Sequence, residues 1–212
     1  MASEKPTIDV MEDAPLIVKG LDKLTDAENQ PIPMEKGVIA LCRCGKSSEK
    51  PFCDGTHSKI GFSGAREQSE DGNVREYEGK EITVVDDVSI CCHAGACAEG
   101  AETVFFSEEG DERVSTPDEG TVEQIIATIR KCPSGSLAYK LKDKLHDIYF
   151  SEAEIQVTKD GPLEIRGGIE LNNPEGPAPR TTDHYTLCRC GASKNHPFCD
   201  GSHNDVGFSD ED

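Results

Sequence analysis

Cysteine and histidine residues recur at the same spacing in two parts of this chain. Residues 41–63 read LCRCGKSSEKPFCDGTHSKIGFS, and residues 187–209 read LCRCGASKNHPFCDGSHNDVGFS. Each segment has a Cys-x-Cys pair, eight further residues and then Cys-x-x-x-His. This pattern places four soft or borderline ligands in a span too short to build a hydrophobic core. We therefore expect each segment to fold around a metal centre.

The two cysteines of each Cys-x-Cys pair can reach one iron, and the later cysteine and histidine, one helical turn apart, can hold a second. Four ligands would then hold a two-iron, two-sulfide cluster. The predicted ligands are Cys42, Cys44, Cys53 and His57 in the first segment and Cys188, Cys190, Cys199 and His203 in the second. From ligand chemistry alone, a Cys3His zinc site stays open. A disulfide is disfavoured, because a Cys-x-Cys pair bridges poorly.

A short helix is expected to begin at Asp54 and at Asp200, because aspartate is a favoured N-cap. Its free N–H groups would face the anionic cluster.

The pattern CRCGxSxxxPFCDG[TS]H resembles the CDGSH-type iron-sulfur domain, the family that includes mitoNEET. The further signature residues Ser47, Pro51, Ser193 and Pro197 are also present. The resemblance implies a [2Fe-2S] cluster held by three cysteines and one histidine at the solvent edge. It also implies a β lobe in which two protomers exchange strands, and here the second protomer would be the second repeat of the same chain. The signature strongly disfavours zinc.

The histidine ligand has a consequence for the predicted clusters. A neutral ligand raises the reduction potential above that of an all-cysteine cluster, and histidine competes for protons near neutral pH. We therefore expect both clusters to become labile as the pH falls toward about 6.

A second constellation lies between the repeats. The order CCHAGAC, an amphipathic helix and then CPSGSLAY resembles the divergent 4Fe-4S mono-cluster domain, whose pattern is CxHAGxC followed by a distant CP[ST]G. The resemblance covers about 77–141 and implies Cys91, Cys97 and Cys132 as ligands. Three cysteines suffice for a [3Fe-4S] cluster, whereas a [4Fe-4S] cluster needs another ligand. The fourth ligand could be Cys92, His93 or solvent. Two other interpretations also stay open: Cys92 is a buried thiol that binds no iron, or the whole segment binds no metal.

The elements around these motifs follow from hydrophobic alternation and capping signals. Half-buried strands are expected at Leu16–Val18 and Leu163–Ile165, with second strands entering each Cys-x-Cys pair. Between the repeats, 64–79 reads as a linker, 81–85 as a strand and 139–157 as further strand. Thr121–Lys131 is the best helix, with isoleucines on one face and a capping-box pattern at Thr121 and Gln124.

These expectations define an α+β protein with two small β-rich CDGSH modules at 13–63 and 160–209. The modules should form an intrachain pseudo-dimer around a ferredoxin-like domain at 77–141.

Composition narrows the possible partners and the compartment. The net charge of −19 disfavours nucleic acid and anionic membranes as partners, and it suits a partner with a basic face. The N-terminal residues lack a secretory leader, so reduced thiols and a cytoplasmic location are expected. His146, His184 and His196 lie outside the motifs and are expected at the surface.

No arrangement of residues indicates catalysis of a bond-making reaction, so the protein is not expected to be an enzyme. We expect electron transfer between protein partners. The alternatives are a cluster donor to apo acceptors, a redox or iron sensor, and a zinc-stabilised interaction scaffold. The chain is expected to be a monomer with internal pseudo-two-fold symmetry.

Overall fold

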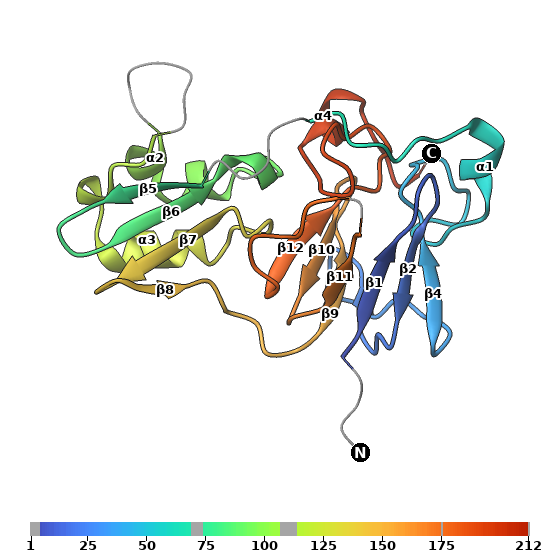
Figure 1. Ribbon diagram of the computed structural model, residues 1–212, viewed down its shortest axis with the longest axis horizontal. Coiled ribbons are helices and arrows are strands. Elements are labelled where there is room, and N and C mark those ends of the chain that lie inside the picture. The colour runs from blue at the N-terminus through green and yellow to red at the C-terminus, as the bar shows by residue number, and fades with distance from the viewer. Residues whose placement is uncertain (1–4, 69–73, 107–113, 175, 212) are drawn as a thin grey trace.

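The computed structural model describes residues 5–68, 74–106, 114–174 and 176–211. Two lobes lie side by side: a helix-covered sheet built from the middle of the chain and a pair of small sheets built from its two ends (Figure 1). No helix in these described ranges has the length and apolar character needed to cross a membrane.

The two repeats fold into the same succession of elements. The first contains β1 (Thr7–Val10), β2 (Leu16–Lys19), β3 (Leu24–Thr25), β4 (Val38–Leu41) and α1 (Thr56–Ile60). The second contains β9 (Glu154–Val157), β10 (Leu163–Arg166), β11 (Glu170–Asn172), β12 (His184–Leu187) and α4 (Ser202–Asp205). The strands expected from alternation at β2 and β10, and those leading into the ligands at β4 and β12, are all present.

The repeats exchange strands within the chain. One sheet has the order β11-β1-β2-β4, and the other has the order β12-β10-β9-β3. Thus β11 of the second repeat pairs in parallel with β1, with Ile8 opposite Leu171. In return, β3 of the first repeat pairs in parallel with β9, with Leu24 opposite Ile155. The predicted intrachain pseudo-dimer is confirmed.

A single hydrophobic core joins the two sheets. Leu16 and Val18 from β2 pack in the same cluster as Leu163 and Ile165 from β10, and all four are buried. Apolar residues alternate along these strands, so one face of each sheet turns toward the other. Neither repeat therefore has a complete core of its own.

The central domain is an antiparallel sheet packed against helices. Its elements are β5 (Val74–Glu78), β6 (Thr83–Asp87), a 3-10 turn (Val88–Ile90), α2 (Ala96–Phe105), a second 3-10 turn (Pro117–Glu119), α3 (Val122–Ile129), β7 (Leu137–Leu141) and β8 (Lys144–His146). The strands follow the order β5-β6-β7-β8. Phe105 of α2, Ile125 of α3 and Val84 of β6 share a second buried core.

Some sequence expectations for this domain were wrong in detail. Residues 74–78 of the predicted linker at 64–79 form β5, whose backbone pairs with β6. The strand expected at 81–85 begins two residues later, and the one expected at 139–157 is broken into parts of β7, β8 and β9. Helix α3 has the predicted cap, since Thr121 Oγ1 accepts from Gln124 N–H at 3.2 Å. The Gln124 side chain instead donates to the Gly100 carbonyl.

Candidate metal centres

The four predicted ligands of the first repeat come together at the end of β4. The Sγ atoms of Cys42 and Cys44 lie 3.6 Å apart, and Cys53 Sγ lies 3.3 Å from His57 Nδ1. Strand β4 carries the chain into the Cys-x-Cys pair. The first turn of α1 carries His57, so that it faces Cys53.

Short polar contacts fix the loop between these ligands. Ser47 Oγ donates to the Phe52 carbonyl at 2.6 Å, and the Asp54 carboxylate accepts from the N–H groups of Ser48 and Thr56. These backbone hydrogen bonds, from Ser48 first and then Thr56, hold the pKa of Asp54 far below its usual range. The helix cap itself is Gly55 rather than the expected Asp54, and Gly55 N–H points at Cys53 Sγ, 3.4 Å away.

The second repeat reproduces this geometry. Cys188 and Cys190 have Sγ atoms 3.6 Å apart, and Cys199 Sγ lies 3.4 Å from His203 Nδ1. The corresponding loop bonds are also present: Ser193 to the Phe198 carbonyl, and Lys194 N–H and Ser202 N–H to Asp200. Gly201 caps α4 in place of the expected Asp200.

The ligands are arranged as two pairs in each repeat. Two sulfur ligands of one tetrahedral metal, with bonds of about 2.3 Å, lie about 3.8 Å apart, which is close to the spacing of each Cys-x-Cys pair. Across the described ranges, no three His, Cys, Asp or Glu side chains are arranged to hold a single ion. The donors therefore fit a centre that takes two ligands on each of two irons better than one tetrahedral zinc ion.

Burial favours the protonated thiol at Cys44 and Cys199. Desolvation raises the pKa of Cys44 to about 11 and that of Cys199 to about 12. A metal must displace these protons to gain thiolate ligands, so loading of either site releases protons.

The two sites meet across the pseudo-two-fold axis. A Cβ placed on Gly45 would lie 2.3 Å from the Cys190 carbonyl oxygen, and one on Gly191 would lie 2.6 Å from that of Cys44. Both glycines have positive φ values, +74° and +82°, which glycine adopts at little cost. Each ligand loop is therefore in direct backbone contact with the other.

A buried arginine inside each Cys-x-Cys pair anchors its loop. Arg43 Nε donates to the Ala14 carbonyl and Arg189 Nε to the Gly161 carbonyl, both at 2.6 Å. Arg189 also forms a two-pronged ion pair with Asp210. In the first repeat the position equivalent to Asp210 is Gly64, which lies against the Arg43 guanidinium.

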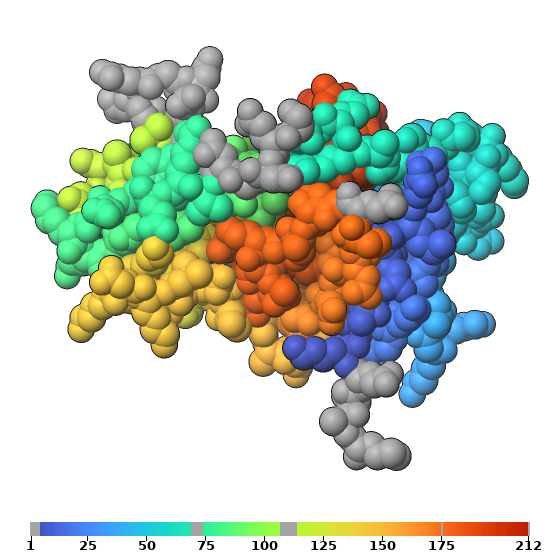
Figure 2. Space-filling view, in the orientation of Figure 1, coloured from blue at the N-terminus to red at the C-terminus, as the bar shows by residue number. Residues whose placement is uncertain are grey.

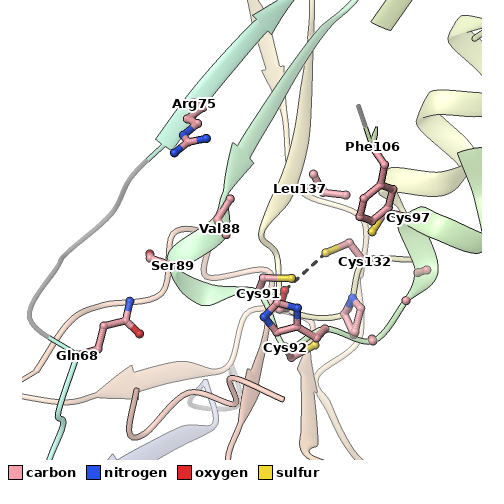
Figure 3. Close-up of a pocket in the computed structure, with 16 residues that line it drawn as sticks. Gln68, Arg75, Val88, Ser89, Cys91, Cys92, Cys97, Phe106, Cys132 and Leu137 are labelled. Atoms are coloured by element: carbon pink, nitrogen blue, oxygen red, sulfur yellow. Dashed lines mark hydrogen bonds between the residues drawn. The ribbon is translucent and has the colours of Figure 1, made fainter. Parts of the chain in front are cut away.

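The central cysteines line a cavity of about 640 Å³. Cys91 follows the first 3-10 turn, Cys97 lies in the first turn of α2, and Cys132 follows α3. Figure 3 shows the sulfur atoms of Cys91 and Cys132 turned toward one another across this cavity. Burial raises the pKa of Cys132 above its usual value. The three predicted ligands are thus brought to one site from three separate elements.

Cys92 and His93 also line this cavity, but they contact the second repeat as well. Cys92 is buried, and in Figure 3 its sulfur points away from Cys91 and Cys132. Burial first, and then the nearby Cys199 and Cys132, raise its pKa strongly. His93 has a φ of +55° and lies against Gly201 of the second repeat. The burial of Cys92 and the direction of its sulfur agree with the buried-thiol alternative for this residue.

Two of the histidines expected at the surface are buried. His184 is 1% exposed and lies 3.0 Å from Asp183, and His196 is 4% exposed with its ring edge-on to Phe62. His146 stacks on Tyr139. The expectation was wrong for His184 and His196, because contacts between distant segments cover both residues.

Comparisons with known proteins agree with the domain order. A family model described as "Iron-binding zinc finger CDGSH type" matches residues 13–58 and 160–204, and one described as "Divergent 4Fe-4S mono-cluster" matches 77–142. The "Uncharacterized protein YjdI" of Escherichia coli K12 is 36% identical over 72 residues, which are 34% of this chain and 92% of that protein. The same protein of strain O157:H7 matches equally.

No solved structure matches the chain. The family models nevertheless support an iron-sulfur protein. The chain belongs to the CDGSH-type iron-binding family through two copies of its domain, with a divergent 4Fe-4S mono-cluster domain between them.

Proposed function

We propose that the protein holds two Cys3His [2Fe-2S] clusters and one [3Fe-4S] or [4Fe-4S] cluster, and that it transfers electrons between protein partners. When bound, such clusters accept and donate single electrons. The observation that carries the proposal is the contiguity of the three ligand sets. The first site touches the second through Gly45 and Cys190, and Cys92 lies between the second site and the central cysteines.

The residues supply what a carrier of this kind needs. The paired cysteines and histidines would hold the metal atoms, and the buried arginines anchor the ligand loops by hydrogen bonds to carbonyls of other segments. The histidine in each site keeps the negative charge lower than a fourth thiolate would, which favours a higher potential. The acidic surface suits a partner with a basic face.

A cluster donor or redox sensor is the second candidate. It is favoured by the exposure of the first site, where Cys53 and His57 are only half-buried. A zinc-stabilised scaffold is the third, although the pairing of the ligands does not favour it.

Metal and sulfide analysis of the purified protein tests the proposal first. Equimolar iron and sulfide with visible absorbance supports it, with about four irons per chain if the central site is empty and seven or eight if it is filled. Zinc without sulfide would overturn it. Reversible reduction by a flavoprotein reductase, without cluster loss to an apo-ferredoxin, then supports the carrier. The reverse result supports the donor.

A further inference from the structure

The two CDGSH sites have the same ligands but different surroundings. Cys199 is 2% exposed and Phe198 is buried, whereas Cys53 and Phe52 at the equivalent positions are half-buried. The difference comes from what packs on each site, because the loops themselves make the same internal hydrogen bonds.

The central domain covers the second site with residues 89–93, which we call the cap. Asn195 Nδ2 donates to the Ser89 carbonyl at 2.8 Å. A Cβ on Gly201 would lie 3.2 Å from His93 and 3.4 Å from the Cys92 carbonyl oxygen. Ile90 of the cap packs into the core that the two repeats share. Both sides of the second ligand loop are therefore held by the central domain.

The segment that leaves the first module adds a second contact. Arg66 Nε donates to Asn195 Oδ1 at 2.8 Å, and the N–H groups of Glu67 and Gln68 donate to the Lys194 carbonyl. In Figure 2 this segment is the teal chain that leads to the grey residues 69–73, and it lies against the orange and red second module. Asn195, which is 1% exposed, thus joins the ligand loop to the cap and to this segment.

The first site has no equivalent cover among the described residues. Glu49 occupies the position of Asn195 and is exposed. A Cβ on Gly55 would meet no described atom within 4 Å. Water and chelators can therefore reach both Cys53 and His57 at the first site, whereas at the second site His203 is partly exposed but Cys199 is covered.

We infer that the cap retains the second [2Fe-2S] cluster, so that iron exchange with solvent and acceptor molecules takes place at the first site. This inference rests on the proposed binding of two [2Fe-2S] clusters. Loss of one site's iron breaks its bonds to three thiolates and one imidazole. Water supplies the protons that these ligands and the departing sulfides take up, and a chelator takes the iron.

EDTA challenge of the intact holoprotein tests the inference. The remaining [2Fe-2S] content is counted by EPR after reduction at each time point. We expect two phases of equal amplitude, with the slow phase at least about tenfold slower. Asn195→Ala removes two hydrogen bonds between the ligand loop and its cover, so it should accelerate the slow phase about tenfold and leave the fast phase unchanged. Glu49→Ala, at the matched position, should change neither phase.

A second matched pair keeps the test decisive if Asn195→Ala does not fold. Gly55 and Gly201 both have positive φ values, +84° and +89°, so alanine adds similar strain at each site. Only the Cβ added by Gly201→Ala also presses on His93. Gly201→Ala should therefore accelerate iron release from the second site more than Gly55→Ala accelerates it from the first site. The inference is overturned if the wild type loses its [2Fe-2S] content in a single phase, or if the two variants of each matched pair have equal effects. The proposed binding of two clusters would survive either result. Absence of a [2Fe-2S] signal before the challenge overturns the proposed function instead.

Discussion

The close approach of the two Cys-x-Cys loops leads to a specific prediction for Gly45→Ala. The new Cβ would lie 2.3 Å from the Cys190 carbonyl oxygen, where ordinary contact begins at 3.4 Å. The two ligand loops must separate by about 1 Å to accept it. Left-handed backbone strain costs about 1–2 kcal/mol for a non-glycine residue, and overpacking of this kind adds about 1–3 kcal/mol.

Gly55→Ala is the control, because Gly55 has a similar positive φ and no described atom near its Cβ. It should carry the strain alone, about 1–2 kcal/mol. A chain of this size shifts its melting temperature by about 2–4 °C per kcal/mol. Gly45→Ala should therefore melt about 2–12 °C below Gly55→Ala. Both are measured by circular dichroism and visible absorbance at one scan rate.

The content of each cluster gives a second readout. Because the displaced carbonyl belongs to a ligand of the other repeat, Gly45→Ala should weaken both [2Fe-2S] sites, while Gly55→Ala should affect only the first. Equal melting of the two variants, or loss confined to the first site in Gly45→Ala, would refute the direct contact between the loops.

Three further predictions concern the shared fold, the central site and one ion pair. A fragment of residues 5–68 lacks half of the common core and the partners of its exchanged strands, so once loaded with iron and sulfide it should sediment as a homodimer; a loaded monomer would contradict this. Cys92→Ala should keep the central iron and Cys132→Ala should lose it, as iron analysis would show; equal loss would make Cys92 a ligand. Asp210→Asn leaves the buried Arg189 unpaired and should cost about 2 kcal/mol at pH 7, allowing for the partial exposure of the carboxylate. Burial opposes the shift, but hydrogen bonds from Arg189 and from a backbone N–H outweigh it and lower the pKa of Asp210. The stabilisation is therefore present above the usual pKa of about 3.9 and fades as the pH falls below it. A melting difference from wild type that persists at pH 2–3 would contradict this assignment.

The repeat allowed the strand-exchanged architecture to be predicted from sequence. Alternation in Leu16–Val18 and Leu163–Ile165 marked the inner strands, and the family signature implied the exchange. Helix α2 was missed because Gly100 and a non-helical Ala101 interrupt its pattern. Gly100 is explained only by the fold, since a Cβ there would lie 2.4 Å from Thr128 Oγ1.

The ligands could be predicted because their spacing is local, whereas their surroundings could not. Asn195 is one polar residue in a polar loop, and nothing in its neighbourhood indicates that Ser89 and Arg66 will converge on it. The same holds for Gly45. A glycine follows the Cys-x-Cys pair in both repeats, but this pattern does not show that the Cys190 carbonyl oxygen will lie against Gly45. These contacts join residues far apart in the chain, and the hydrophobic pattern carries no information about them.

The position of the central domain between the repeats explains how one sequence motif comes to form two unlike sites. Two identical protomers would present both ligand loops to solvent equally. Here the described part of the inserted domain covers the second loop, and its cap includes Cys91, a predicted ligand of the central site. Filling the central site would thus hold the cap against the second loop, because the same short segment serves both. Retention of the second cluster should then depend on occupancy of the central site, whereas release from the first site should not.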